Sequence, residues 1–226
     1  MNNWIKYNLT VDDWDKLIAI LFYNNLEELG PGNFCDVGAC DGVYTTFFNS
    51  IDPESKVFSF ELNPYNFEKL KSLRTRKCII ENMAISNIDG DVNFFSDNSE
   101  SGNHLSNITG YDTNNQKMRY FGKIKSTKLD TYFKNIKVDY IKIDVEGAEL
   151  DVIKGGVETL RNCKFAVIEC HHDKDWQNIV NFCKSEKLNF KNIVDDVPIY
   201  YSENVIPTSG LSSVGRTYQM YIKNIK

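Results

Sequence analysis

The sequence predicts an α/β protein with a mostly parallel central sheet, helices on both faces of the sheet and an antiparallel C-terminal strand. Short apolar segments alternate along the chain with helical segments, and the apolar segments run without polar interruption, as in strands buried on both faces. At 226 residues, 42% of them hydrophobic, the chain is long enough for one core and short for two. We therefore expect a single domain over 1–226, with a helical extension at 1–32 and the α/β core at 33–226.

The first half of the chain carries an amphipathic helix and then the first strand–helix pairs. Residues 11–29 have a helical pattern, which Thr10 can cap and which a Gly-Pro-Gly cluster ends. Apolar and helical segments alternate after it. The predicted strands are 33–37, 56–62, 77–85 and 91–95, and the predicted helices are 43–50 and 65–73.

The second half begins with a long polar segment, 98–125, that is rich in asparagine, serine and glycine. Connections of this length in compact domains are usually functional or mobile, so we expect a loop that acts as a lid. The closing segment, 215–223, has a strand pattern with no helix before it, which predicts an antiparallel strand at one side of the sheet. The remaining predicted strands are 138–145 and 164–170, followed by helices at 148–161 and 174–187.

Polar side chains stand at the ends of the predicted strands. In open α/β sheets, ligands bind outside the carboxyl ends of the strands, where such side chains gather along one edge. The sequence therefore predicts one pocket at that edge. The residues are Asp36, Glu61, Asn82, Asp144 and Glu169.

The loop after the first strand, in the stretch NFCDVGACDGVYTT (33–46), indicates the charge of the ligand. Its glycines, Gly38 and Gly42, lie four positions apart, so the G-x-G-x-x-G fingerprint of dinucleotide binding is not met. Asp36 and Asp41 would also repel a pyrophosphate. A cationic ligand is favoured, which disfavours a nicotinamide-dependent oxidoreductase. A plain turn with glycines kept for packing is the structural alternative.

S-adenosylmethionine meets these demands. Its amino group and sulfonium are cationic and suit Asp36 and nearby carbonyl groups, and its carboxylate can accept hydrogen bonds from N–H groups of the glycine loop. A carboxylate at the next strand end, Glu61, can hold its ribose hydroxyls.

Three segments resemble the FkbM family of S-adenosylmethionine-dependent methyltransferases. DVGACDGVYT (36–45) is similar to the family's glycine loop, and VFSFELNPYNFEKLKSL (57–73) to its acidic second block. The most distinctive segment is K-I-D-V-E-G-x-E, which lies within 127–156. The similarity covers roughly 33–171.

The resemblance implies a Rossmann-like class I methyltransferase fold and O-methylation of a hydroxyl on a sugar, glycan or other small molecule. It also implies that Asp36, Gly38, Gly42 and Glu61 bind the cofactor, with Asn82 near the adenine. A non-catalytic binding module that keeps the fold stays open as an alternative.

Two segments supply candidate catalytic residues. Asp144 ends a central strand beside the expected methyl donor and could orient the acceptor hydroxyl or take its proton. Glu146 could assist, although acids in the first turn of a helix also complement its dipole. In IECHHDKDW (168–176), His171 could act as a base near neutral pH, or the histidines could lie in a solvated loop. Oxygen ligands at strand ends also suit Mg²⁺, but no spacing demands it, and we expect no metal.

Composition limits the possible partners and location. The net charge of −5 argues against a surface built for nucleic acid. The six cysteines form no C-x-x-C pair and read as reduced thiols. The first residues contain no apolar secretory segment, and no segment is long enough to span a membrane. We expect a cytoplasmic enzyme that acts on a small molecule or glycan and can form a homo-oligomer.

Overall fold

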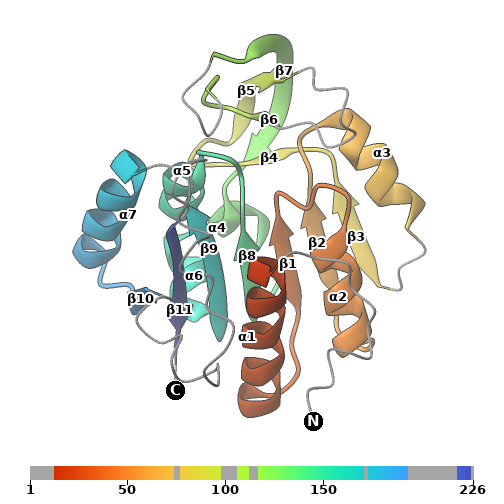
Figure 1. Cartoon of the computed structure of the whole chain (residues 1–226), viewed down its shortest axis with the longest axis vertical. Coiled ribbons are helices and arrows are strands. Elements are labelled where there is room, and N and C mark those ends of the chain that lie inside the picture. The colour runs from red at the N-terminus through yellow and green to blue at the C-terminus, as the bar shows by residue number, and fades with distance from the viewer. Residues whose placement is uncertain are drawn as a thin grey trace.

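The computed structural model describes residues 13–73, 77–97, 106–111, 117–170, 173–192 and 218–224. Their central sheet has seven strands in the order β10-β11-β9-β8-β1-β2-β3 (Figure 1). β1, β2, β3, β8 and β9 are parallel, and β11 is antiparallel to both of its neighbours. The strands are β1 (Phe34–Val37), β2 (Val57–Phe60), β3 (Cys78–Glu81), β8 (Tyr140–Ile143), β9 (Phe165–Cys170), β10 (Phe190–Asn192) and β11 (Tyr218–Lys223).

Helices cover both faces of this sheet, as predicted (Figure 1). One face packs on α1 and α2, and the other packs on α4 to α7. α3 lies beside β3 and contacts the loop that precedes α2. The helices are α1 (Asp13–Leu29), α2 (Val43–Ile51), α3 (Pro64–Ser72), α4 (Leu129–Tyr132), α5 (Glu149–Lys154), α6 (Val157–Asn162) and α7 (Asp173–Ser185).

The alternation of side chains along each strand decides which residues meet which helices. Phe34 and Tyr140, which are register partners on β1 and β8, point toward α1 and α2. Their rings stack with centroids 4.9 Å apart, and Phe48 of α2 stacks on Phe34 at 4.5 Å. Full burial of each such ring stabilises the fold by roughly 2–3 kcal/mol. The same alternation places Asp36, two residues after Phe34, on the α2 face.

A second, smaller sheet lies beyond the carboxyl ends of the central strands (Figure 1). It corrects the prediction of one long loop over 98–125, because part of that segment forms β6 and β7. One side of β7 is exposed and carries charged residues, so its sequence resembled a polar connection. Two parts of the predicted lid, 98–105 and 112–116, lie outside the described residues. In the order β4-β7-β5-β6, the strands are β4 (Ala84–Ile85), β7 (Arg119–Thr127), β5 (Gly90–Ser96) and β6 (Ser106–Asn107).

Two further predicted elements are divided in the structure. The strand predicted at 77–85 becomes β3 and β4, which belong to different sheets. The helix predicted at 148–161 is broken at Gly155 and Gly156 into α5 and α6. Gly155 passes close to Ser86, since a Cβ at Gly155 would lie 2.0 Å from the Ser86 carbonyl oxygen. The C-terminal strand is antiparallel, as predicted, but lies between β9 and β10. The short elements α4 and β10 were not predicted.

The thiols agree with the sequence prediction, since all six cysteines are free. In the part of the chain that the structure describes, no helix combines the length and the apolar character needed to cross a bilayer.

Candidate functional site

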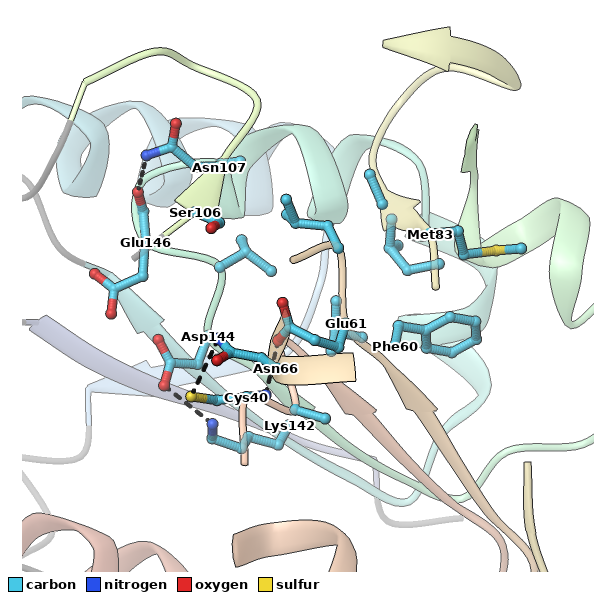
Figure 2. A pocket seen from close by; sticks show the side chains of 18 of the residues that line it. Cys40, Phe60, Glu61, Asn66, Met83, Ser106, Asn107, Lys142, Asp144 and Glu146 are labelled. Atoms are coloured by element: carbon cyan, nitrogen blue, oxygen red, sulfur yellow. Dashed lines mark hydrogen bonds and ion pairs between the residues drawn. The ribbon is translucent and has the colours of Figure 1, made fainter. Parts of the chain in front are cut away.

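A cavity of about 490 Å³ lies where β1, β2 and β8 end, beneath β4 and β6 of the second sheet (Figure 2). β1 pairs with β2 on one side and with β8 on the other. From β1 the chain first builds the sheet outward through β2 and β3, and later builds it in the opposite direction through β8 and β9. This is the switch point at which open α/β sheets bind ligands. The volume is in the range of small-molecule sites. Lining residues that the sequence predicted are Gly38, Asp41, Glu61, Asp144 and Glu146.

Glu61 directly follows β2 and is 6% exposed. Its Oε2 accepts a hydrogen bond from the N–H of Cys40 at 2.8 Å, and its Oε1 accepts one from the N–H of Asn63 at 2.6 Å. Burial raises the pKa of Glu61 to about 7, although the two N–H groups oppose the shift. The carboxylate is thus fixed at the cavity wall, and each oxygen keeps a further lone pair for a ligand hydroxyl.

The glycine loop donates its N–H groups within the protein. The N–H groups of Gly38 and Ala39 both donate to the carbonyl of Phe60 at 3.0 Å, and that of Gly42 donates to the carbonyl of Ala39 at 2.8 Å. With the Cys40 N–H on Glu61, four donors of the loop are engaged within the protein. These four N–H groups already have acceptors within the protein, and a contact between the loop and the cofactor carboxylate stays a prediction.

The two glycines make room for neighbouring parts of the chain. Gly38 has φ +83°, and a Cβ there would lie 1.7 Å from the carbonyl oxygen of Asp144. Gly42 has φ +88°, and its Cβ would meet the side chains of Leu70 and Leu73. Both glycines are therefore required by packing, which the sequence reading had kept as the alternative.

We expect Gly38→Ala to lower the free energy of unfolding by at least about 2 kcal/mol more than Gly30→Ala, because overpacking adds to backbone strain. Gly30 is the matched control, since it has φ +78° and nothing within 4 Å of an added Cβ. Denaturant unfolding of both variants measures the difference. Equal destabilisation would show that the close approach to Asp144 can relax.

Of the described residues predicted to bind the cofactor, Asp36, Gly42 and Asn82 do not line the cavity. Asp36 is fully buried, and its Oδ2 accepts a hydrogen bond from the Thr45 hydroxyl at 2.8 Å. Burial raises the pKa of Asp36, and the Lys142 ammonium opposes that shift. The Asn82 amide donates to the carbonyl of Glu61 at 2.8 Å. Asp36 and Asn82 thus support the site from behind its wall.

Lys142 also lines the cavity, and it was not among the site residues predicted from the sequence. It is 5% exposed, and its Nζ lies 3.0 Å from Oδ2 of Asp144 (Figure 2). The ammonium also lies over the Tyr44 ring, 4.5 Å from its centroid. Burial favours the neutral amine, but the carboxylates of Asp144 and Asp36 outweigh it and raise the pKa of Lys142 above its ordinary value. A lysine in an otherwise apolar strand was the available signal.

Glu146 lies in a strained turn at the cavity rim. It has φ +57°, and its carbonyl accepts a hydrogen bond from the Asn107 amide at 2.9 Å (Figure 2). Asn107 belongs to β6, so this bond joins the second sheet to the loop after β8. His171, the third predicted catalytic residue, and His172 lie outside the described residues.

The opposite wall of the cavity is apolar, and Figure 2 shows Phe60 and Met83 together on it. Such a wall suits a flat, weakly polar ring. The sequence had no signal for this wall, because three separate segments supply it. Its residues are Phe60, Leu62, Met83, Ala84, Ile85 and Ile108.

Carboxylates predominate among the charged groups of the cavity. The described lining residues include four acids, Asp41, Glu61, Asp144 and Glu146, against a single ammonium, Lys142. This excess favours a ligand with positive charge over one with a pyrophosphate. Across the described ranges, no three histidine, cysteine, aspartate or glutamate side chains gather as a metal site would require.

Comparison with known proteins gives a family match and two relatives. Residues 36–194 match the sequence model of the methyltransferase FkbM domain. Hexuronic acid methyltransferase AglP of Haloferax volcanii is 28% identical over 161 residues, which cover 68% of this chain and 62% of that protein. 2-O-methyltransferase NoeI of Sinorhizobium fredii is 30% identical over 160 residues, which cover 59% of this chain and 61% of that protein. The chain thus spans about three fifths of the length of these relatives.

Solved structures share the fold. Methyltransferase FkbM from Methylobacillus flagellatus aligns with a TM-score of 0.53 at 14% identity, over 84% of this chain and 43% of that one. A putative rRNA-methylase from Clostridium thermocellum aligns with a TM-score of 0.53 at 10% identity, over 96% of this chain and 99% of that one. The arrangement of strands and helices is therefore that of class I methyltransferases.

Proposed function

Because the chain belongs to the FkbM methyltransferase family, we propose that it transfers a methyl group from S-adenosylmethionine to a hydroxyl group of a sugar or glycan. The observation that carries this proposal is the cavity at the β1 switch point, with Glu61 on its floor, an apolar wall on one side and acids on the other. The alternatives, a nicotinamide-dependent oxidoreductase and a non-catalytic module, predict different outcomes in the experiments below.

The residues present fit this methyl donor. Glu61 would accept hydrogen bonds from the ribose hydroxyls while it holds the Cys40 and Asn63 N–H groups. The apolar wall formed by Phe60, Met83 and their neighbours would cover the adenine. Asp41 would face the cationic part of the molecule. Gly38 would have a structural role, because the absence of a side chain allows the loop to pack closely on Asp144.

The acceptor would occupy the end of the cavity near Asp144 and Glu146. S-adenosylmethionine, when bound, supplies a methyl group on a positively charged sulfur, and its transfer to an alcohol releases one proton. Asp144 would orient the acceptor hydroxyl and take that proton. Glu146, and His171 from outside the described residues, would be further candidates for contact with the acceptor.

The names of the two relatives support a sugar as the acceptor. One is a hexuronic acid methyltransferase and the other a 2-O-methyltransferase. The test is incubation of the protein and S-adenosylmethionine with a panel of hexuronic acid and neutral hexose glycosides, followed by mass spectrometry. We expect one glycoside class to gain a single methyl group on oxygen, and Asp144→Asn to slow this gain by about 100-fold or more. Methylation of peptide or nucleic acid substrates, with none of the glycosides, would contradict a sugar acceptor.

We expect affinity for S-adenosylmethionine to weaken as pH falls below about 7. Burial raises the pKa of Glu61 to about 7, an effect that Asp36 adds to and Lys142 opposes. A neutral acid accepts hydroxyl hydrogen bonds less well than a carboxylate, so binding would follow the ionised form. Kd should rise about tenfold for each pH unit below about 7. Calorimetric titrations in matched buffers measure this slope, and Glu61→Gln should lack it. An unchanged wild-type Kd down to about pH 5 would rule out this role of the Glu61 carboxylate.

A further inference from the structure

Lys142 places a buried ammonium on the cavity wall, at a position where an apolar side chain could pack equally well. Within the described lining residues it is the sole cation, and its strand is otherwise apolar: Tyr140, Ile141 and Ile143 are all fully buried. Burying an ion costs several kcal/mol unless other charges compensate. A hydrophobic side chain of similar volume at such a position is often neutral or stabilising. Stability alone therefore does not explain a lysine here.

The surroundings of Lys142 hold its ammonium group in one place. Asp36 is its direct register partner on β1, and Asp144 follows it by two residues, so both carboxylates lie on the same face of the sheet. Glu169 reaches this face from β9, where Val167 is the register partner of Lys142. The Tyr44 ring of α2 covers the ammonium. The charged and titratable groups that act on it are Asp36, Glu61, Asp144, Glu169, Tyr44 and Cys40.

Asp144 is more exposed than the lysine that it pairs with. Its side chain is 23% exposed and lines the cavity, whereas the Lys142 side chain is 6% exposed. The 3.0 Å bond from Nζ holds Oδ2 of Asp144 and so limits the orientations of the carboxylate. Asp36 lies behind the wall and keeps the ammonium in place from the other side.

Building on the proposed function, we propose that Lys142 is a positioning residue: it holds Asp144 ionised and in one orientation toward the acceptor hydroxyl. When the hydroxyl gives up its proton, the O–H bond of the acceptor breaks and an O–H bond forms on Asp144. Lys142 stays charged throughout, because Asp36 and Glu169 remain beside it. Lys142 thus acts through Asp144 and does not exchange a proton itself.

The test combines two measurements on Lys142→Met, Lys142→Arg and a control, Lys164→Met. Lys164 also lies over a tyrosine ring and within 3.8 Å of an aspartate, but near the opposite ends of the strands. Carbon-13 NMR of the labelled aspartate carboxyl groups follows the titration of Asp144. The Asp144 signal is assigned by its absence from the spectrum of Asp144→Asn. Steady-state kinetics with the glycoside found by the screen give kcat against pH.

In Lys142→Met, we expect kcat to fall about 100-fold while the KM for S-adenosylmethionine stays within about threefold. The Asp144 titration and the acidic limb of the kcat profile should move together to higher pH. Lys142→Arg should restore most of the activity, and Lys164→Met should match the wild type. If circular dichroism shows that Lys142→Met does not fold, Lys142→Gln replaces it with the same expectations.

An acidic limb that stays in place in Lys142→Met, or a kcat within about threefold of the wild type, would overturn the inference. Failure of the proposed function looks different. The wild type would then transfer no methyl group to any glycoside, and the NMR titration would still report whether Lys142 controls Asp144.

Discussion

Glu61→Ala is expected to weaken the binding of S-adenosylmethionine by at least about 100-fold, because it removes an ionised acceptor for two ribose hydroxyls, each worth roughly 1.5–3 kcal/mol. The effect should be this large because Glu61 is 6% exposed and already fixed by the Cys40 and Asn63 N–H groups. Its geometry is set before the ligand arrives, so little ordering has to occur on binding. Isothermal titration calorimetry measures the change.

Glu81→Ala is the matched control for this variant. Glu81 ends β3 as the register partner of Phe60, and it does not line the cavity in the described part of the chain. We expect its affinity for S-adenosylmethionine to equal that of the wild type. Thermal unfolding of both variants separates lost binding from lost folding, since Glu61→Ala also leaves two N–H groups without their acceptor. Equal affinities in Glu61→Ala and Glu81→Ala would disprove the ribose-binding role.

Asp144→Asn is expected to lower methyl transfer by about 100-fold or more, with the affinity for S-adenosylmethionine changed by no more than about threefold. The amide keeps the size of the side chain but cannot take a proton, and it loses the charge that faces Lys142. Single-turnover transfer to the glycoside measures the chemical step, and calorimetry measures the binding.

Asp151→Asn is the control for this second variant. Asp151 lies in α5, outside the cavity, and its Oδ1 accepts a hydrogen bond from Asn87 at 3.0 Å. We expect its transfer rate to be that of the wild type. A rate for Asp144→Asn within about tenfold of the wild type would mean that another group takes the proton, and His171 would be the next residue to replace.

The sequence predicted the parts of the fold that depend on local pattern. Continuous apolar segments such as 33–37 and 164–170 became central strands, because residues buried on both faces leave a readable signature. Because the carboxyl ends of parallel strands lie at one edge, the predicted strand ends placed Asp36, Glu61 and Asp144 at that edge of the sheet. The position of the site could therefore be predicted before the structure.

The second sheet could not be predicted in this way. β7 has one exposed side with charged residues, and β4 and β6 are two residues each, too short for a pattern. The role of Asn82 was also missed, because its side chain bonds to the chain after β2 and not to the cavity. Such contacts depend on how loops meet in space, which spacing along the chain does not record.

Lys142 shows a different limit. It is the first residue of the K-I-D-V-E-G-x-E motif, but a lysine between two isoleucines is typical of a strand residue whose charge reaches solvent. Only the register with Asp36 and the packing under Tyr44 show that the ammonium stays inside. The packing partner of Gly38 could not be predicted for a similar reason, since the Asp144 carbonyl that Gly38 must accommodate lies more than a hundred residues further along the chain.

The central claim is that the cavity binds S-adenosylmethionine, and calorimetric titration of the wild-type protein with S-adenosylmethionine, S-adenosylhomocysteine and NAD tests it most directly. We predict micromolar binding of the first two and none of NAD, because the described residues that line the cavity include four acids and one ammonium. Binding of NAD without S-adenosylmethionine or S-adenosylhomocysteine would contradict the account and would indicate an oxidoreductase.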